Sequence, residues 1–286
     1  MTLAGAKLGV GADADFDYIR KLVADRAAIV LDDSKQYLVE SRLLPLARSE
    51  GVTGLSGLVG RLRVRGPSDP LVTAVVEAMT TNETSFFRDP PVFETLRTSI
   101  LPDLIAKRSA ARRLRIWSAA ASTGQEAYSV VMLLREHFPE LSGWRVEVLG
   151  TDLSTAVLEK ARIGVYSRFE VARGLSTERL GRWFRPKGAD YQLDRSILDA
   201  VQFRPLNLVT PGPLPQSDLV LLRNVLIYFD LETRRRILTR VRAAMEPGSW
   251  LLLGTAENPD DADLQRVQFG HGVAYQPRGP ARGTTR

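Results

Sequence analysis

The sequence contains no cysteine and only two histidines, His137 and His271. The absence of cysteine excludes disulfide bonds, thiolate metal sites and cysteine nucleophiles, and two histidines cannot build a histidine-rich metal site. No apolar run approaches the roughly 18 to 20 residues that a membrane helix needs, and the first residues lack the apolar core of a signal peptide. We therefore expect a cytoplasmic protein without a metal centre and without membrane insertion.

The net charge of +6 is distributed unevenly along the 286 residues. Residues 1–80 hold equal numbers of basic and acidic side chains, so the whole excess lies in residues 81–286. Within that part, residues 160–187 carry eight lysines and arginines against Glu170 and Glu178. Such a focused basic patch favours an anionic partner, either a nucleic acid or an acidic protein surface, although a solvated arginine-rich surface gives the same pattern.

The first 80 residues show apolar side chains at helical spacing and no strand pattern, which predicts a small all-α domain at residues 1–80. The pattern consists of three stripes, which are Phe16, Ile19, Leu22 and Val23, then Leu38, Leu43, Leu44 and Leu46, then Leu71, Val75, Val76 and Met79.

From Leu114 onward, short apolar runs alternate with amphipathic stretches. The predicted strands are 114–119, 146–152, 218–222 and 250–255, and the predicted helices are 125–137, 154–162 and 231–245, with Pro247 and Gly248 as the turn before the last strand. Near-continuous apolar strands separated by helices predict a parallel sheet covered on both faces. The expected fold is therefore a doubly wound α/β domain at residues 81–286.

Residues 164–206 interrupt this alternation and are rich in glycine and arginine. Residues 191–194 and 200–204 predict a hairpin, so we interpret the segment as a small β-subdomain inserted at the rim of the sheet. The chain ends, residues 1–12 and about 277–286, are expected to be mobile tails.

The segments after the predicted strands are candidates for a ligand site, because ligands of doubly wound sheets bind beyond the carboxyl ends of the strands. Residues 119–124 have small side chains, which let a ligand approach the backbone before helix 125–137 begins. The run is neither a dinucleotide motif nor a P-loop, so neither a pyrophosphate nor a triphosphate is favoured.

Asp152 ends the second strand, where such folds bind ribose hydroxyls, and capping of the helix that starts near Ser154 is the alternative role. Two later pairs supply amides suited to an adenine edge and to an amino acid carboxylate or ammonium, namely Asn207 with Leu208 and Asn224 with Val225. A nucleoside without a phosphate cradle fits S-adenosylmethionine.

Four motifs occur in order along the chain: TTNETSFFRD at 80–89, WSAAASTGQEAYS at 117–129, GTDLS at 150–154 and RNVLIYFD at 223–230. Together they resemble the CheR-type chemotaxis receptor methyltransferases, which methylate glutamate side chains of bacterial chemoreceptors. The resemblance covers about residues 14–276. It implies a Rossmann-like methyltransferase domain with an inserted β-subdomain, an N-terminal all-α domain that faces the receptor, and S-adenosylmethionine as the donor, with S-adenosylhomocysteine as the product.

The matching motif positions imply a set of cofactor contacts and two residues near the reaction. Arg88 and Tyr228 are the candidates nearest the reaction, and a buried ring with a satisfied hydroxyl is the alternative for Tyr228. The alternative for Phe86 and Phe87, in the same motif as Arg88, is core packing. The implied cofactor contacts are Asn82, Thr84, Arg88, Glu126, Asp152, Asn207, Leu208, Asn224 and Val225.

The chain departs from the family pattern at Gln125 and Ala127, where an acidic residue and a proline are common, and at Thr255, where a histidine is usual. These departures suggest one alternative, a low-turnover S-adenosylmethionine-sensing or receptor-docking module. A nucleic acid methyltransferase is another, suggested by the basic insert and by DPPVF at residues 89–93. We interpret the two prolines there as the start of a helix that carries Phe93 and Leu96.

Methyl transfer to a carboxylate needs no general base, because the nucleophile is already charged at neutral pH. This agrees with a chain that is poor in histidine and cysteine. The leading prediction is a protein-glutamate O-methyltransferase that acts on the cytoplasmic domains of chemoreceptors and does not bind nucleic acid.

Overall fold

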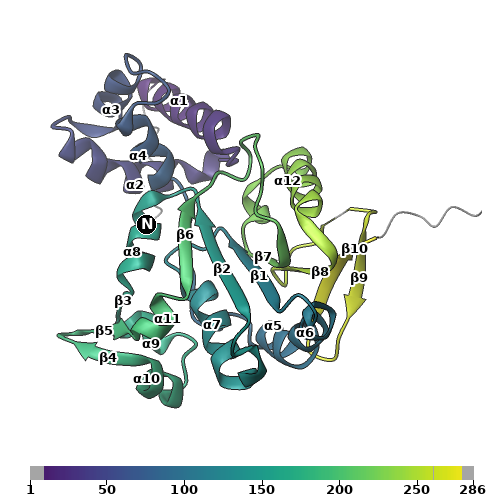
Figure 1. Cartoon of the computed structure of the whole chain (residues 1–286). Helices are drawn as coiled ribbons and strands as arrows, with labels where there is room; N and C mark the ends of the chain where they lie inside the picture. The colour runs from purple at the N-terminus through teal and green to yellow at the C-terminus, as the bar shows by residue number, and fades with distance from the viewer. Residues whose placement is uncertain (1–9, 260, 279–286) are drawn as a thin grey trace, which may run out of the picture. The chain divides into compact units, whose positions relative to one another are not determined.

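The computed structural model describes residues 10–259 and 261–278 (Figure 1). Its contacts divide the chain into two units, one with the residues up to Thr81 and Tyr228–Asp230, the other with Asn82–Ile227 and the residues from Leu231 onward. The tails expected at 1–12 and about 277–286 lie mostly outside the described ranges, and residues 10–12 belong to the first helix. No helix within the described ranges is long and apolar enough to cross a membrane.

The N-terminal unit is helical, as predicted. Its elements are α1 (Val10–Ala27), η1 (Asp33–Lys35), α2 (Gln36–Ser49), α3 (Gly54–Leu62) and α4 (Pro70–Ala78). The predicted stripes of α1 and α4 are largely buried, but the stripe predicted for α2 is partly wrong. Val39, Leu43 and Ala47 form its buried line, because they recur every four residues on one face, and the other predicted leucines are half-buried beside them.

The second unit is built on a seven-stranded sheet in the order β6-β2-β1-β7-β8-β10-β9. The strands from β6 to β8 in this order are parallel, as predicted, whereas β10 is antiparallel to both β8 and β9. The sheet is therefore mixed, and the prediction omitted its last two strands. The strands are β1 (Arg113–Ala119), β2 (Arg145–Asp152), β6 (Val201–Pro205), β7 (Ser217–Leu222), β8 (Met245–Leu253), β9 (Leu264–Gln268) and β10 (Val273–Pro277).

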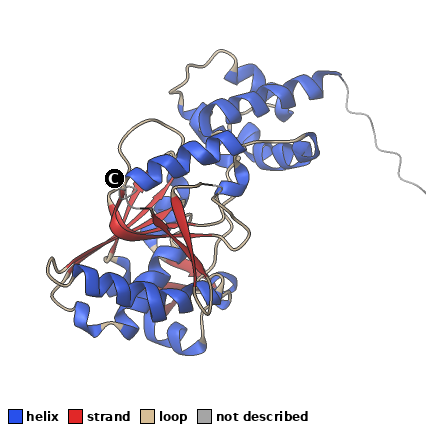
Figure 2. Ribbon diagram, turned by 90° about the vertical axis from the view of Figure 1, so that its right-hand side faces the viewer, coloured by secondary structure: helices blue, strands red, loops and turns tan. Residues whose placement is uncertain are grey.

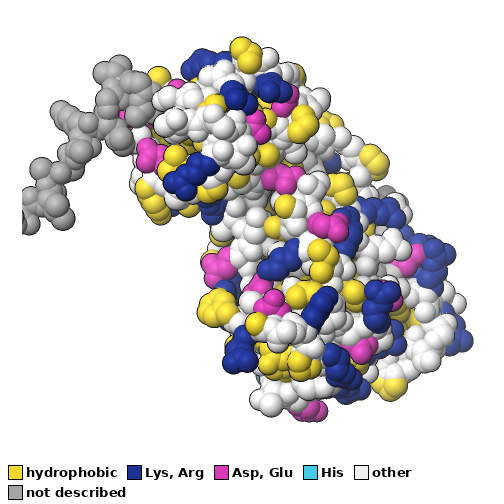
Figure 3. Space-filling model, turned by 90° about the vertical axis from the view of Figure 1, so that its left-hand side faces the viewer, with side chains coloured by type: hydrophobic (Ala, Val, Ile, Leu, Met, Phe, Trp, Pro, Cys, Tyr) yellow, Lys and Arg dark blue, Asp and Glu magenta, His cyan; other side chains and the backbone are white. Residues whose placement is uncertain are grey.

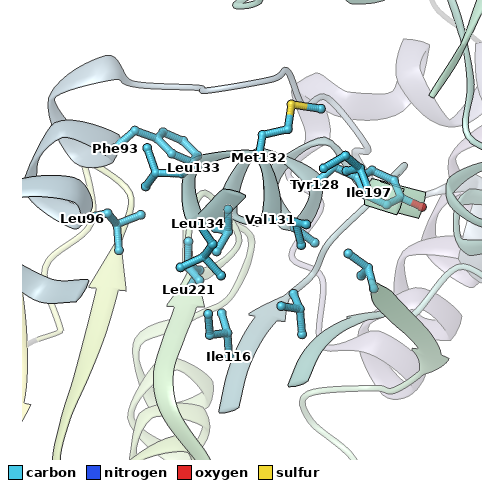
Figure 4. Packing of buried hydrophobic residues seen from close by; sticks show 14 of the residues in the cluster. Phe93, Leu96, Ile116, Tyr128, Val131, Met132, Leu133, Leu134, Ile197 and Leu221 are labelled. Atoms are coloured by element: carbon cyan, nitrogen blue, oxygen red, sulfur yellow. The ribbon is translucent and has the colours of Figure 1, made fainter. Parts of the chain in front are cut away.

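Helices cover both faces of this sheet (Figure 2). The apolar side chains of α7 pack on the strands, with Val131 and Leu134 near Ile116 and Leu221 (Figure 4). Continuous burial along β7 agrees with the near-continuous apolar pattern expected for a central parallel strand. Outside the insert, the helices of this unit include α5 (Pro90–Thr95), η2 (Leu96–Ile100), α6 (Leu101–Arg108), α7 (Gln125–His137), η3 (Pro139–Leu141), α8 (Thr155–Ile163) and α12 (Leu231–Ala243).

The turn predicted at Pro247 and Gly248 is wrong, because both residues lie inside β8. The register between β7 and β8 shifts there, from Ser217 opposite Met245 to Leu219 opposite Trp250. Such an irregularity tolerates a proline and a glycine that a regular ladder would exclude.

The inserted segment forms a separate antiparallel sheet in the order β3-β5-β4. The predicted hairpin between residues 191–194 and 200–204 is wrong, because β5 pairs with β4 and β3, whereas β6 pairs with β2 in the large sheet. Asp194 accepts a hydrogen bond from the Ser196 amide and starts a short helix that separates β5 from β6. The elements are β3 (Val165–Ser167), α9 (Arg168–Ala172), α10 (Thr177–Trp183), β4 (Phe184–Lys187), β5 (Asp190–Leu193) and α11 (Arg195–Leu198).

Candidate functional site

The carboxyl ends of four parallel strands lie at one edge of the large sheet. The register places Ala119 opposite both Thr151 and Leu222, and Asp152 opposite Pro205. The segments that leave these strands therefore start side by side, as the sequence predicted. They carry most of the polar residues proposed for the site.

Asp152 is buried at the end of β2, where its carboxylate joins two loops. Its Oδ2 accepts a hydrogen bond from the Ser122 amide at 2.8 Å, and its Oδ1 accepts one from the Ser154 amide at 3.0 Å. The N-cap of α8 is Ser154, whose hydroxyl accepts from the Val157 amide. The N-cap is therefore Ser154 and not Asp152, so the capping alternative is wrong, and the Asp152 carboxylate instead holds the loops after β1 and β2 together.

The loop between β1 and α7 has an unusual backbone with three positive φ values. Ala120 and Ser122 have φ values of 57° and 51°, and Gly124 has 92°. A Cβ on Gly124 would lie 2.8 Å from the Tyr128 ring, so only glycine fits there. The Ser122 hydroxyl donates to the Asn82 carbonyl at 2.8 Å, which brings the motif around Asn82 against this loop.

A buried guanidinium links three segments of the site. The Arg223 side chain is 1% exposed, and it donates to Glu126 Oε2 at 2.9 Å. It also donates to Asp89 Oδ2 at 2.6 Å and to the Arg88 carbonyl at 2.9 Å. Glu126 accepts a further bond from the Ser118 hydroxyl at 2.7 Å. The sequence analysis did not assign this role to Arg223, although an arginine directly after a buried apolar strand is a signal for a paired charge.

Arg88 lies between two residues with left-handed backbones, Phe87 at φ 46° and Asp89 at φ 62°. The Phe87 amide donates to the Ser129 hydroxyl at 2.9 Å, and Arg88 Nη1 donates to the Glu83 carbonyl at 3.0 Å. Backbone conformations of this kind persist only where the surroundings hold them, so the position of Arg88 is set by its neighbours.

Phe86 and Phe87 are both buried, which confirms the core-packing interpretation. The Phe86 ring makes edge-to-face contacts with Tyr166 and Phe184 of the insert. The Arg179 guanidinium lies 3.7 Å from the centre of the Phe87 ring. The insert therefore packs directly on the segment that carries Arg88.

Charged contacts join the same two segments. Arg173 of the insert donates to Glu83 at 2.8 Å. This hydrogen bond and the charges of Arg173 and Arg88 hold the pKa of the Glu83 carboxyl below its usual range. Arg179 forms a bidentate pair with Glu136 of α7, whose side chain is 10% exposed. These contacts help to fix the insert on the α/β unit.

The DPPVF segment forms the start of α5, as predicted, with Phe93 and Leu96 buried. Asp89 is its N-cap residue, and the two prolines occupy the first turn. This segment follows helix α4 and not a strand, so it differs from a base-binding motif, which would follow a strand.

The remaining predicted residues differ in how they relate to this cluster. Thr84, Asn224 and Val225 are half-buried, and Leu208 is buried after β6. Asn207 Oδ1 accepts from the Val209 amide at 3.1 Å. Tyr228 ends η4 (Leu226–Tyr228) and groups with the helical unit, where its carbonyl accepts a bond from the Val30 amide.

The structure thus connects four predicted residues through two separate series of hydrogen bonds. Asn82 is joined to Asp152 through Ser122, and Arg88 is joined to Glu126 through Arg223. Glu257, a buried carboxylate after β8, also contacts this region and was missed by the sequence analysis. Its only sequence signal is a lone acidic residue close to the end of an apolar strand.

These groups fit a nucleoside that carries an amino acid group. Asp152 lies where a carboxylate accepts bonds from ribose hydroxyls, and each oxygen of Glu126 retains a lone pair for an ammonium. The segments that follow β1, β2, β6 and β7 contain no lysine, which fits a ligand without a phosphate chain. The polar groups at the strand ends therefore match S-adenosylmethionine.

Comparison with known proteins gives the same answer. The CheR methyltransferase all-alpha domain matches residues 14–80, and the CheR methyltransferase SAM binding domain matches residues 82–270. The chain is 42% identical over 272 residues to Chemotaxis protein methyltransferase 1 of Pseudomonas aeruginosa, covering 93% of this chain and 98% of that protein. It is 37% identical over 256 residues to the chemotaxis protein methyltransferase of Escherichia coli, covering 86% of this chain and 85% of that protein. The chain therefore belongs to the CheR family of S-adenosylmethionine-dependent chemotaxis protein methyltransferases.

Proposed function

We propose that this protein transfers the methyl group of S-adenosylmethionine to glutamate side chains of bacterial chemoreceptors in the cytoplasm, giving glutamyl methyl esters during chemotactic adaptation. The observation that carries the proposal is the similarity to chemotaxis protein methyltransferases over nearly the full length of the chain. The connected carboxylates, amides and arginines at the strand ends support it, because they suit this donor and a carboxylate acceptor.

We assign a separate function to each of three parts of the chain. Residues 1–80 form the receptor-facing helical domain, and residues 81–286 form the methyltransferase domain. The insert, which the sequence placed at about 164–206, is assigned to docking of the receptor. Within that range, β6 is counted with the large sheet because it pairs with β2.

The reaction is an in-line displacement. S-adenosylmethionine supplies a methyl group activated by a sulfonium. A carboxylate oxygen of the acceptor glutamate, ionised at neutral pH, forms a bond to the methyl carbon as the carbon–sulfur bond breaks. The bonding electrons stay on sulfur, and the products are a methyl ester and S-adenosylhomocysteine. Catalysis then consists mainly of alignment, which contributes up to about 7–11 kcal/mol in favourable cases.

The protein's own residues have distinct proposed roles. Asp152 binds the ribose hydroxyls, and Glu126 binds the ammonium. The remaining cofactor contacts are Asn82, Thr84, Arg88, Asn207, Leu208, Asn224 and Val225. Arg88 orients the acceptor carboxylate, and Tyr228 is the second residue proposed near the reaction. A tight ion pair with Arg88 would stabilise the ground state more than the transition state, where charge is dispersed. Arg88 therefore acts by orientation.

The basic segment at residues 160–187 contributes fewer free cations than its composition suggests. Lys160, Arg162, Arg173 and Arg179 each pair with a carboxylate, so these four are largely neutralised. Acidic side chains lie between the basic ones on the face of the molecule that includes the insert (Figure 3). Composition alone therefore overstates the positive field of this segment.

Four cations of residues 160–187 form no ion pair among the residues that the structure describes, namely Arg168, Arg182, Arg185 and Lys187. The last three lie within six residues of one another in the chain. Arg182 lies in the last turn of α10, and Arg185 and Lys187 lie exposed on β4, which is an edge strand of the small sheet. We assign the docking of an acidic receptor segment to these three residues, since focused charge raises the rate of encounter with an oppositely charged partner.

The test is incorporation of labelled methyl groups into cytoplasmic fragments of chemoreceptors, with and without their C-terminal tails. Esters release methanol in alkali, whereas methylated amines do not, and a sensing module would incorporate nothing. Base-labile label on the receptor supports the proposal. Base-stable label, label on nucleic acid or no label at all would reject it.

The docking assignment is tested by measuring the association rate of receptor fragments with a triple variant, Arg182→Gln, Arg185→Gln and Lys187→Gln. We expect slower association with receptor fragments at low salt and unchanged affinity for S-adenosylhomocysteine. The difference from the wild type should shrink as added salt shortens the Debye length. A wild-type association rate at low salt would remove these residues from the docking surface.

A further inference from the structure

One buried carboxylate outside the residues assigned above holds the loop that follows β7. Glu257 is 9% exposed, and its two oxygens accept hydrogen bonds from four backbone amides. Oε2 accepts from Asn224 and Gly254, each at 2.8 Å. Oε1 accepts from Leu226 at 2.8 Å and from Ile227 at 3.3 Å. A single side chain thus connects the end of β8 to the whole stretch from residue 224 to residue 227.

The backbone around Glu257 is shaped to admit its carboxylate. Asn224 has a φ of 57°, a conformation that needs support from its surroundings. A Cβ on Gly254 would lie 2.7 Å from Glu257 Oε2, 2.8 Å from Asn224 Nδ2 and 3.0 Å from the Asn224 amide nitrogen. Residue 254 must therefore be glycine for the loop and the carboxylate to approach each other this closely.

We propose that Glu257 is a positioning residue for the cofactor, which sets where Asn224 and Val225 meet it. The inference rests on the proposed function, which assigns Asn224 and Val225 to cofactor binding. The physical reason is that four amide donors converge on one side chain. Only an ionised carboxylate has acceptors on both oxygens and no donor, whereas an amide side chain would turn an N–H toward amides that already donate.

The main test is the isosteric substitution Glu257→Gln, with S-adenosylhomocysteine as the calorimetric probe. We expect the affinity to fall about tenfold or more, because at least one buried amide loses its acceptor and the loop moves. Glu257→Asp keeps the charge but shortens the side chain, so it should lie between the wild type and Glu257→Gln. Gly254→Ala perturbs the same contact from the other side and should weaken binding while the carboxylate is retained.

The matched control is Glu170→Gln in the insert. Glu170 also accepts from a backbone amide, that of Ser167, in the capping box of α9, and it pairs with Lys160. This substitution should lower the melting temperature without changing the affinity for S-adenosylhomocysteine. A general loss of stability is thereby separated from a loss of cofactor positioning.

Steady-state kinetics give a second readout that simple destabilisation would not produce. Glu257→Gln should raise the KM for S-adenosylmethionine while the KM for the receptor fragment stays near the wild-type value. A smaller fraction of folded enzyme would instead lower kcat and leave both KM values unchanged. That second pattern would overturn the inference.

Asn224→Ala separates failure of this inference from failure of the proposed site. If Asn224→Ala weakens binding and folded Glu257→Gln stays within twofold of the wild type, the role of Glu257 is refuted and the site stands. If neither substitution weakens binding, the assignment of this loop to the cofactor is wrong, and the inference falls with it. Weaker binding in both variants, with the control unchanged, supports the inference.

Discussion

Replacing Asp152 by asparagine tests the cofactor assignment directly, because it removes the charge and keeps the shape. A charge-assisted bond to the ribose hydroxyls contributes about 1.5–3 kcal/mol. Since each 1.4 kcal/mol is a factor of ten, the affinity for S-adenosylhomocysteine should fall about 10- to 150-fold. Asp152→Ala should be worse, because the Ser122 and Ser154 amides, which donate to the two carboxylate oxygens, would both lose their acceptor.

Calorimetry on the folded proteins measures this effect, and Asp194→Asn is the matched control. Asp194 accepts from the Ser196 amide at 2.9 Å and from its hydroxyl at 2.6 Å, at the start of α11 in the insert. Both asparagine variants should lose some thermal stability, but only Asp152→Asn should lose affinity. Unchanged affinity in Asp152→Asn would show that this carboxylate only holds the loops together, and the ribose assignment would be refuted.

Further substitutions probe the rest of the site and the core. Arg88→Lys keeps the charge but loses the planar fork, so the initial rate of receptor methylation should fall; full activity in Arg88→Ala would reject the orienting role. Arg223→Met leaves two carboxylates without their buried partner, so the free energy of unfolding in urea should drop by about 3–5 kcal/mol, and a wild-type urea midpoint would contradict the network. Burial raises the pKa of Tyr128 and Tyr166 above the usual value of 10.0. Their contribution to stability is therefore complete below about pH 10 and is lost as the pH rises further, because the unfolded chain then loses protons that the folded chain retains. Tyr128→Phe and Tyr166→Phe should each flatten this alkaline fall in urea midpoint, and an unchanged slope would argue against buried hydroxyls.

The parallel core of the sheet could be predicted from the sequence, because its signals are local. The helix predicted at 125–137 has the bounds of α7, and the strands predicted at 114–119 and 146–152 differ from β1 and β2 by one residue at the start. Each of these elements is an apolar run or an amphipathic stretch bounded by small or polar residues. Such patterns depend on the element itself and not on what it pairs with.

The errors arose where pairing decides the structure. The burial of β6 alternates at its start, with Val201 and Phe203 inside, which is also the pattern of a half-buried hairpin strand. Its true partner, β2, ends about 50 residues earlier in the chain, and no local signal reports that distance. The strand β9 was missed for a related reason, because most of its residues are exposed and its pattern resembles a loop.

The site shows the same division between local and distant signals. Asp152 was predicted because it ends a recognisable strand, and Glu126 was predicted because it lies in a motif that resembles the family. The partnership of Arg223 with Glu126 spans 97 residues, and that of Glu257 with Asn224 spans 33, so neither follows from the spacing within a motif. Glu136, the partner of Arg179, likewise lies far outside the basic segment in sequence. Counting charges within that segment therefore could not show that Arg179 is paired.

The distribution of backbone strain connects the fold to the proposed chemistry. Of the seven non-glycine residues with positive φ in the described chain, five lie in or beside the segments at the strand ends: Phe87, Asp89, Ala120, Ser122 and Asn224. Such conformations cost about 1–3 kcal/mol each and persist only where other contacts hold them. Four of the five are held by side chains of this region, through the hydroxyl of Ser129, the guanidinium of Arg223 and the carboxylates of Asp152 and Glu257. Two of these groups, Asp152 and Glu257, are also the ones proposed to bind or position the cofactor, so their substitution should change affinity and stability together. In the insert, Asp194 caps α11 and Glu170 completes the capping box of α9, so substitutions there should change stability alone.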